Sequence, residues 1–79
     1  MSSFEFVVWK GDEIAHREPA PQGARMICKR ARALMRSFRA DEVVLVWKYE
    51  DGNVASFGNW LRDEYGRIID GREGVGECD

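Results

Sequence analysis

The sequence predicts an α+β fold, in which an antiparallel β-sheet of about five strands carries one amphipathic helix on one face. Most of the chain consists of short runs of aromatic and β-branched residues separated by turn residues, a pattern typical of strands. One longer segment, residues 21–39, instead repeats its apolar side chains at every third or fourth position, which is the period of a helix. The predicted order along this chain of 79 residues is β-β-α-β-β-β.

The first two strands form a predicted hairpin. Phe4–Lys10 is rich in aromatic and β-branched residues, and Gly11–Glu13 supplies the turn that follows. Ile14–Glu18 is predicted to return beside it as a weaker strand. The segment Pro19–Pro21 ends this strand, because proline cannot donate to a β-ladder.

The helix is predicted to begin near Pro21 and to end at about Arg39. A proline in the first turn is tolerated, because its missing N–H has no partner within the helix there. One face of this helix is apolar and predicted to pack on the sheet. It comprises Ala24, Ile27, Cys28, Ala31, Leu34, Met35 and Phe38.

The second half of the chain is predicted to continue the sheet. Val43–Tyr49 is apolar on both faces, which indicates a central strand. Asp51-Gly52 is a strong signal for a hairpin turn, and Val54–Leu61 is predicted to return from it with a bulge at Gly58.

Two interpretations remain open for residues 59–66. In one, Asp63–Gly66 forms a turn that leads to a last short strand, Arg67–Asp70. In the other, Asn59 caps a helical turn over Trp60–Tyr65 that Gly66 ends. Either way, we expect residues 1–70 to form a single α+β domain and residues 71–79 to be a flexible, glycine-rich tail.

Charge is strongly segregated along the chain. The segment Arg25–Arg39 holds six bases and no acid, whereas all the other residues hold six bases and 14 acids. Five of the six bases follow one another at spacings of four and three, which places them on one helical face. They are Arg25, Lys29, Arg32, Arg36 and Arg39. This stripe is either a solvated outer face or a surface that contacts phosphates or an acidic protein.

Acidic residues are predicted to gather at one end of the sheet. The up-and-down order of the strands brings the first turn, the exit from the helix and the last turn to the same end. The residues concerned are Asp12, Glu13, Asp41, Glu42, Asp63 and Glu64. They either resemble a row of phosphates that a partner binds, or reflect the usual wealth of acids in solvated turns.

One helix is too small to cover a five-stranded sheet, so part of a sheet face is expected to be exposed or paired. The candidate residues for this face, and for a homodimer built on it, are Val7, Trp9, Val44 and Val46. The alternative is that long side chains such as Lys10, Lys48 and Arg62 lie over it.

No catalytic or metal-binding motif is recognisable in the sequence, so it predicts neither an enzyme nor a metal or cofactor site. His16 has acids nearby but no nucleophile in any recognisable motif, and no glycine-rich loop joins a strand to a helix start. Two cysteines 50 positions apart predict neither a disulfide nor a zinc site, and Cys28 is expected to be a buried, inert thiol. The chain lacks a signal peptide and a long apolar run, so we expect a cytoplasmic protein without a membrane partner.

In type, the chain resembles the small inhibitors that phages encode, above all the anti-CRISPR proteins. The features in common are the short length, the α+β layout, the separation of Arg25–Arg39 from the six clustered acids, and the lack of catalytic residues. The resemblance implies a stoichiometric blocker that occupies a DNA-binding or effector surface of a host protein or nucleoprotein complex in the host cytoplasm. The alternatives are a nucleic-acid-binding module that uses the basic helix, and a homodimeric structural or adaptor protein.

Overall fold

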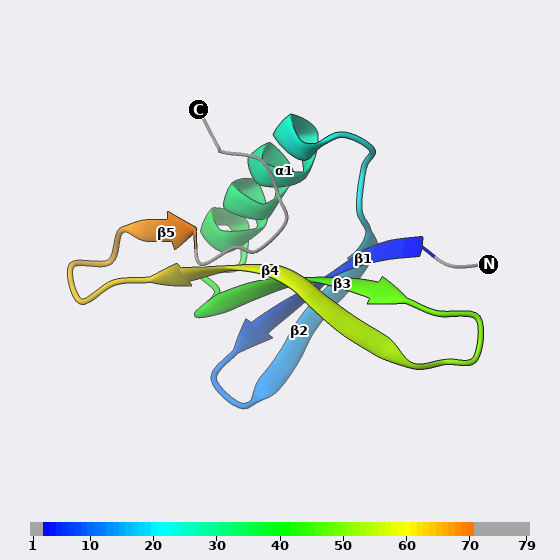
Figure 1. The fold of residues 1–79 in the computed structure, drawn as a ribbon. Coiled ribbons are helices and arrows are strands. Elements are labelled where there is room, and N and C mark those ends of the chain that lie inside the picture. The colour runs from blue at the N-terminus through cyan, green and yellow to red at the C-terminus, as the bar shows by residue number, and fades with distance from the viewer. Residues whose placement is uncertain (1–2, 71–79) are drawn as a thin grey trace.

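The computed structural model describes residues 3–70 and confirms the predicted α+β architecture (Figure 1). The flexible tail expected at residues 71–79 lies outside the described residues. The elements in chain order are β1 (Ser3–Lys10), β2 (Glu13–Pro19), α1 (Ala24–Ser37), β3 (Glu42–Lys48), β4 (Val54–Arg62) and β5 (Ile68–Asp70). The strands form one antiparallel sheet in the order β2-β1-β3-β4-β5, so β1 and β3 occupy its centre.

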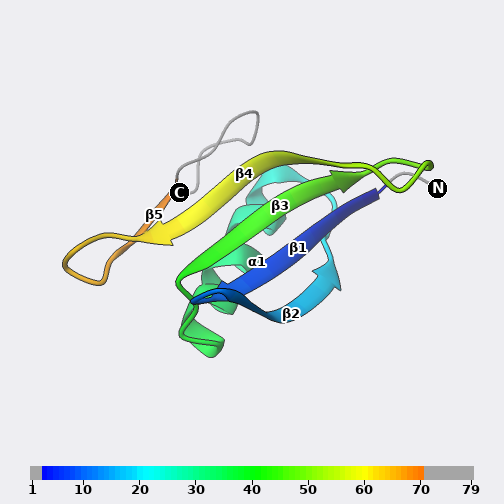
Figure 2. The ribbon, with the colours of Figure 1, turned by 90° about the horizontal axis from the view of Figure 1, so that it is seen from below.

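The helix covers one face of the sheet, and Figure 2 looks onto the other face, with α1 behind the strands. The core lies between α1 and the sheet because strand residues alternate sides and the helix presents its apolar stripe. Phe6 and Trp60 are fully buried there, with their rings edge to face at 6.1 Å. The remaining core residues are Val8, Ile27, Cys28, Ala31, Leu34, Met35, Ala40, Val43 and Leu45.

The helix is shorter than predicted at both ends. It begins at Ala24 rather than near Pro21, because Gly23 has a φ of 95° and the Gly23 carbonyl accepts the first helical bond, from Ile27 N–H. It ends at Ser37, and Arg39 takes the left-handed conformation with a φ of 50°. The Arg39 and Ala40 amides donate back to the carbonyls of Arg36 and Met35, which is the Schellman pattern that usually employs glycine.

Residues 59–66 adopt the hairpin and not the helical turn. Strand β4 continues to Arg62, and the turn is closed by the Asp63 amide on the Arg67 carbonyl at 2.9 Å. Gly66 lies in the turn with a φ of 81°, a conformation that glycine adopts without strain. The predicted bulge is one residue away from Gly58: the β3–β4 register steps from Gly58 to Ser56, which leaves Phe57 as the extra residue.

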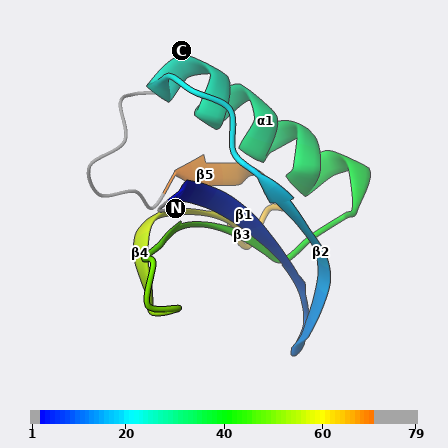
Figure 3. The ribbon, with the colours of Figure 1, turned by 90° about the vertical axis from the view of Figure 1, so that its right-hand side faces the viewer.

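The sheet is strongly curved. In the view of Figure 3 the strands form an arch with α1 over its outer side. On the face away from the helix, Val7 and Val46 are only 5% and 8% exposed, while Trp9 and Val44 are half-buried. The prediction that these four residues form an open apolar face is therefore wrong for Val7 and Val46, which the curved sheet and its own side chains already bury.

The remaining expectations concern membrane association, the cysteine in the helix and the cellular location. Within residues 3–70, no helix is both long and apolar enough to cross a bilayer. Cys28 is buried as predicted, but it is disulfide-bonded, so the expectations of an inert thiol and of no disulfide are wrong. Cytoplasmic location stays a prediction.

Candidate functional site

The cationic stripe forms a continuous face on α1. Arg25, Lys29, Arg32 and Arg36 lie within about 60° of one another around the helix axis, because four- and three-residue steps alternate. Arg25, Lys29 and Arg36 are exposed, whereas Arg32 is half-buried and takes part in a contact. Arg39 is exposed but lies beyond the helix end, so the prediction that all five share one helical face is wrong for this residue.

Other arginines in the described chain are bonded to the protein itself. Arg17 pairs with Glu5 at 3.1 Å. Arg67 pairs with Asp63 at 3.0 Å. Arg62 donates to three backbone carbonyls, those of Met35, Ala40 and Gly66, at 2.8–3.0 Å.

In contrast, four cations of the stripe form no ion pair with another residue of the range 3–70. The cations in question are Arg25, Lys29, Arg36 and Arg39. The helix therefore presents positive charge that the described part of the protein does not neutralise by contact.

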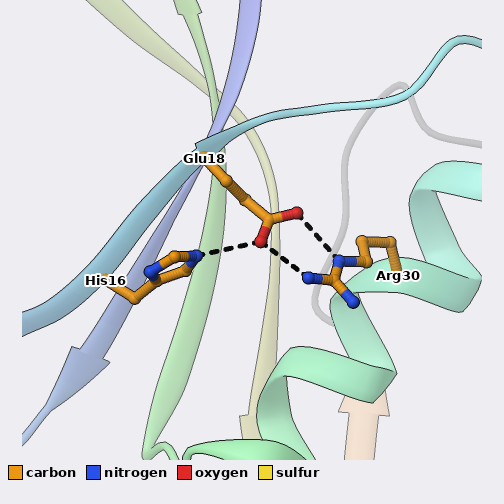
Figure 4. A network of polar contacts seen from close by, with 3 residues as sticks. All are labelled: His16, Glu18 and Arg30. Carbon is orange, nitrogen blue, oxygen red and sulfur yellow. Dashed lines mark hydrogen bonds and ion pairs between the residues drawn. The ribbon is translucent and has the colours of Figure 1, made fainter.

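Arg30 lies on the same helix but pairs with an acidic residue (Figure 4). Its guanidinium donates two bonds of 2.8 Å to the Glu18 carboxylate on β2, and the His16 Nε2 lies 2.9 Å from the same carboxylate. The Arg30 hydrogen bonds, followed by that from His16, lower the pKa of Glu18 to about 2, against the opposing effect of burial. The His16 ring also stacks on Phe38 at 4.8 Å. This network joins the edge strand to the helix and is a structural link.

The structure brings the predicted acidic residues to one end of the sheet. A cleft of about 430 Å³ there has Asp12, Asp41 and Glu42 in its wall, beside Trp9 and Leu61. Glu13 lies opposite Lys10 in the adjoining hairpin. Asp63 and Glu64 follow the end of β4, in the turn that leads to β5.

Three of these six acids accept hydrogen bonds from other residues of the fold. Asp41 accepts a 2.6 Å bond from the Gly11 amide, and Glu42 accepts one of 3.1 Å from Asn59. The backbone amide of Arg67, followed by that of Tyr65 and the Arg67 side chain, lowers the pKa of Asp63.

The other three acids are free for a partner. Asp12, Glu13 and Glu64 are exposed and form no ion pair or side-chain hydrogen bond with another described residue. Hydrogen bonds within the fold therefore account for half of the acidic cluster, and the negative surface that remains is smaller than the sequence predicts.

A second surface was not anticipated from the sequence. At the opposite end of the sheet, on the side of the helix, an aromatic patch consists of Phe4, Trp47, Tyr49 and Phe57. Phe4 lies edge to face with Trp47 at 4.6 Å and with Phe57 at 5.4 Å, and Trp47 contacts Tyr49 at 6.5 Å. Phe57 and Tyr49 remain 36% and 45% exposed, so α1 does not cover this part of the sheet.

A groove opens beside the aromatic patch, beneath the chain that leads into α1. Its volume is about 420 Å³. It is lined by Ser3, Phe4, Pro19, Ala20, Pro21, Gln22, Gly23, Ile27 and Trp47. Local patterns predict each strand but not the contact between these aromatic rings. The β1–β3 register sets Phe4 opposite Trp47, and Phe57, the extra residue of the β4 bulge, contacts Phe4.

Neither a metal-binding cluster nor a comparison with known proteins identifies the functional site. Across residues 3–70, no group of three or more His, Cys, Asp or Glu side chains is placed to hold a metal ion. The chain matches no known family model, no curated protein and no solved structure. The candidate sites are therefore the surfaces just described: the cationic face of α1, the acidic end of the sheet, and the aromatic patch with its groove.

Proposed function

We propose that this protein is a non-enzymatic binding protein that blocks a host protein or nucleoprotein complex by occupying its DNA-binding or effector surface. Small phage-encoded inhibitors of the anti-CRISPR type act in this general way. The observation that carries the proposal is the cationic face of α1. Arg25, Lys29 and Arg36 are exposed there and have no acidic partner within residues 3–70, although Arg17, Arg30 and Arg67 each have one.

The repulsion between neighbouring cations on α1 supports a role for this face in binding a partner. Like charges at i, i+3 and i, i+4 destabilise a helix by a few tenths of a kcal/mol per pair. Arg25, Lys29, Arg32 and Arg36 form three such neighbouring pairs in succession. A partner with a negative surface removes that repulsion, and guanidinium groups bind carboxylates or phosphates through paired hydrogen bonds.

The backbone at the helix end adds a second cost of the same kind. Arg39 adopts a left-handed φ of 50°, where glycine is the usual residue. Position 39 is thus occupied by an arginine although its backbone conformation favours glycine.

Affinity capture from a bacterial lysate tests the proposal. The double variant Arg25→Glu, Arg36→Glu is expected to lose the captured partner while the circular dichroism spectrum stays unchanged, because both side chains are exposed. The matched control is Lys10→Glu, Lys48→Glu, which changes net charge equally at exposed positions on the sheet and is expected to retain the partner.

Nuclease treatment separates this proposal from its alternative. A partner that stays bound after treatment is a protein, whereas complete release would show that the helix is a nucleic-acid-binding module. If the Arg25→Glu, Arg36→Glu variant still captures the same partner, the cationic face is not the binding surface and the proposal is wrong.

A further inference from the structure

A row of large side chains crosses the sheet at its acidic end, on the face away from α1. The strand registers set Trp9 of β1 opposite both Ile14 of β2 and Glu42 of β3. Leu61 of β4 lies opposite Glu42 on one side and opposite Ile69 of β5 on the other. Because residues opposite one another in paired strands project to the same face, these five side chains form one cross-strand row, and four of them are apolar.

The apolar members of this row remain accessible. Ile14 and Ile69, on the two outer strands, are 44% and 45% exposed, whereas Trp9 and Leu61 between them are half-buried. Figure 3 shows α1 on the outer side of the arch, so the row lies on its inner side. An apolar row that stays open on a sheet face is typical of an interaction surface.

The cleft at this end of the sheet lies along the row, and we call it the acidic cleft. It has a volume of about 430 Å³. It is lined by Trp9, Glu42 and Leu61 of the row and by Gly11, Asp12 and Asp41 beside it. Within residues 3–70, three carboxylates and one indole ring thus share this cleft, and none of its lining residues is basic.

The fold holds two of the three carboxylates in place. Oδ2 of Asp41 accepts from the Gly11 amide at 2.6 Å, and Oε2 of Glu42 accepts from the Asn59 side chain at 3.1 Å. A carboxylate has about four acceptor positions, so a single bond leaves each of them able to accept from a partner as well. Acceptors that are already positioned reduce the entropic cost of binding.

The bases that adjoin this end of the sheet do not reverse the charge of the cleft. Lys10 lies opposite Glu13 in the β1–β2 hairpin. Arg62 and Arg67 are bonded within the fold, to backbone carbonyls and to an acid. Arg39 is exposed beyond the helix end and adds one positive charge against the three carboxylates. A positively charged group of a partner therefore complements the cleft.

An arginine side chain matches both kinds of wall in the acidic cleft. Its guanidinium binds carboxylates through paired hydrogen bonds and stacks on indole rings, while its stem is apolar. Trp9 supplies the ring, and Asp12 and Glu42 supply carboxylates. Apolar residues next to that arginine would contact the exposed Ile14 and Ile69 at the ends of the row.

We infer that the acidic cleft and its apolar row bind a basic segment of a partner protein, which inserts an arginine side chain between Trp9 and the carboxylates of Asp12 and Glu42. This surface lies on the opposite face of the sheet from α1. The inference therefore goes beyond the proposed function and does not depend on the cationic face.

The probe for the test is a displayed library of random peptides of about twelve residues. The library is selected on the immobilised full-length protein and counter-selected on Asp12→Lys, an exposed change that removes from the pool the peptides that bind elsewhere. We expect the remaining peptides to contain arginine and at least one large apolar residue. Trp9→Ala is expected to weaken them by about tenfold or more, as loss of a central interface side chain does.

Two matched controls lie outside the acidic cleft. Glu64→Lys makes the same charge change in another exposed turn at this end of the sheet, and Trp47→Ala removes a half-buried tryptophan from the other face. Both are expected to change peptide affinity by less than about threefold, because neither residue lines the cleft and salt screens exposed charges. Equal losses in Trp9→Ala and Trp47→Ala would overturn the inference. Peptides that lack arginine, or a pool emptied by counter-selection, would overturn it as well.

The two proposals fail separately. If Trp9→Ala binds the selected peptides as well as the unchanged protein does, the inference fails and the proposed function stands. If Arg25→Glu, Arg36→Glu keeps its lysate partner, the proposed function fails. That double variant is expected to bind the selected peptides no more weakly than the unchanged protein, and a tenfold loss would move the peptide site to α1 and overturn the inference.

Discussion

Arginine has two separate roles in this protein, and the contacts of each guanidinium distinguish them. Arg62 is the clearest structural case. It lies half-buried in β4 and donates to the carbonyls of Met35 and Ala40 at the helix end and of Gly66 in the last turn. The Met35 carbonyl also accepts from the Ala40 amide, so Arg62 adds a second donor at the helix terminus and joins it to the β4–β5 hairpin.

The substitution Arg62→Met tests this role. We expect the free energy of unfolding to fall by about 2–3 kcal/mol, because three charge-assisted hydrogen bonds are lost while the apolar stem is kept. Denaturation followed by tryptophan fluorescence, to which the buried Trp60 contributes, measures it. The matched control is Arg36→Met, an exposed position of the cationic face, which is expected to change stability by less than about 1 kcal/mol. Equal losses would show that the two classes of arginine do not differ.

At the scale of elements, the weakest junction is between β2 and the rest of the molecule. β2 is an edge strand that pairs only with β1 within the described sheet, and its register shifts beside Trp9. The Glu18 carboxylate fastens this strand to α1 through Arg30, and His16 adds a ring contact with Phe38. The junction therefore depends on the charge of one carboxylate.

That dependence predicts a specific pH effect. Because the folded pKa of Glu18 is about 2 and its ordinary value is 4.5, the stabilisation is fully present above pH 4.5 and is lost as the pH falls toward 2. Glu18→Gln should cost about 1 kcal/mol at neutral pH, since Arg30 is partly exposed, and the difference from the unchanged protein should shrink across that window. Urea midpoints measured from pH 7 to pH 2 give both values.

The control for this prediction is Glu64→Gln, which removes an exposed carboxylate in the last turn. It is expected to leave the midpoints unchanged at every pH. A Glu18→Gln difference that stays constant between pH 4.5 and pH 2 would contradict the role assigned to Glu18.

Across the whole molecule, the candidate surfaces other than the acidic end of the sheet lie on the side of the helix. The cationic face, the aromatic patch and the groove belong to α1 and to the adjoining end of the sheet. The face away from the helix is different, because its central residues Val7 and Val46 are already buried by a single chain. The large apolar side chains that remain exposed on this face, Ile14, Val54 and Ile69, lie on β2, β4 and β5 and not at the centre of the sheet. A stable interface buries about 1,200–2,000 Å² in total.

The homodimer that the sequence suggests therefore becomes the less favoured state. We expect light scattering at high micromolar concentration to give a mass close to 9.1 kDa. A mass of twice that value, halved by Val44→Glu but not by the exposed substitution Ser56→Glu on the same face, would restore the dimer.

The helix, five strands and separation of charge follow from local sequence patterns. Alternation and turn residues predict strands because side-chain direction repeats every two residues, and apolar spacing predicts α1 because a helix repeats every 3.6. The ends of the helix were less predictable. Its start depends on the positive φ of Gly23, and its end on a left-handed Arg39 that no composition rule favours.

Tertiary structure alone decided which residues are available for binding. The sequence cannot show that, within residues 3–70, Arg30 and Arg62 bind distant partners while Arg25 and Arg36 do not. Glu18 lies 12 positions from Arg30, and the Ala40 and Met35 carbonyls lie 22 and 27 positions from Arg62. The same holds for the groove, where strand register and the rim before α1 bring distant segments together. Local preferences act over one or two turns of chain, but pairing between distant segments is fixed only when the whole sheet closes on its core.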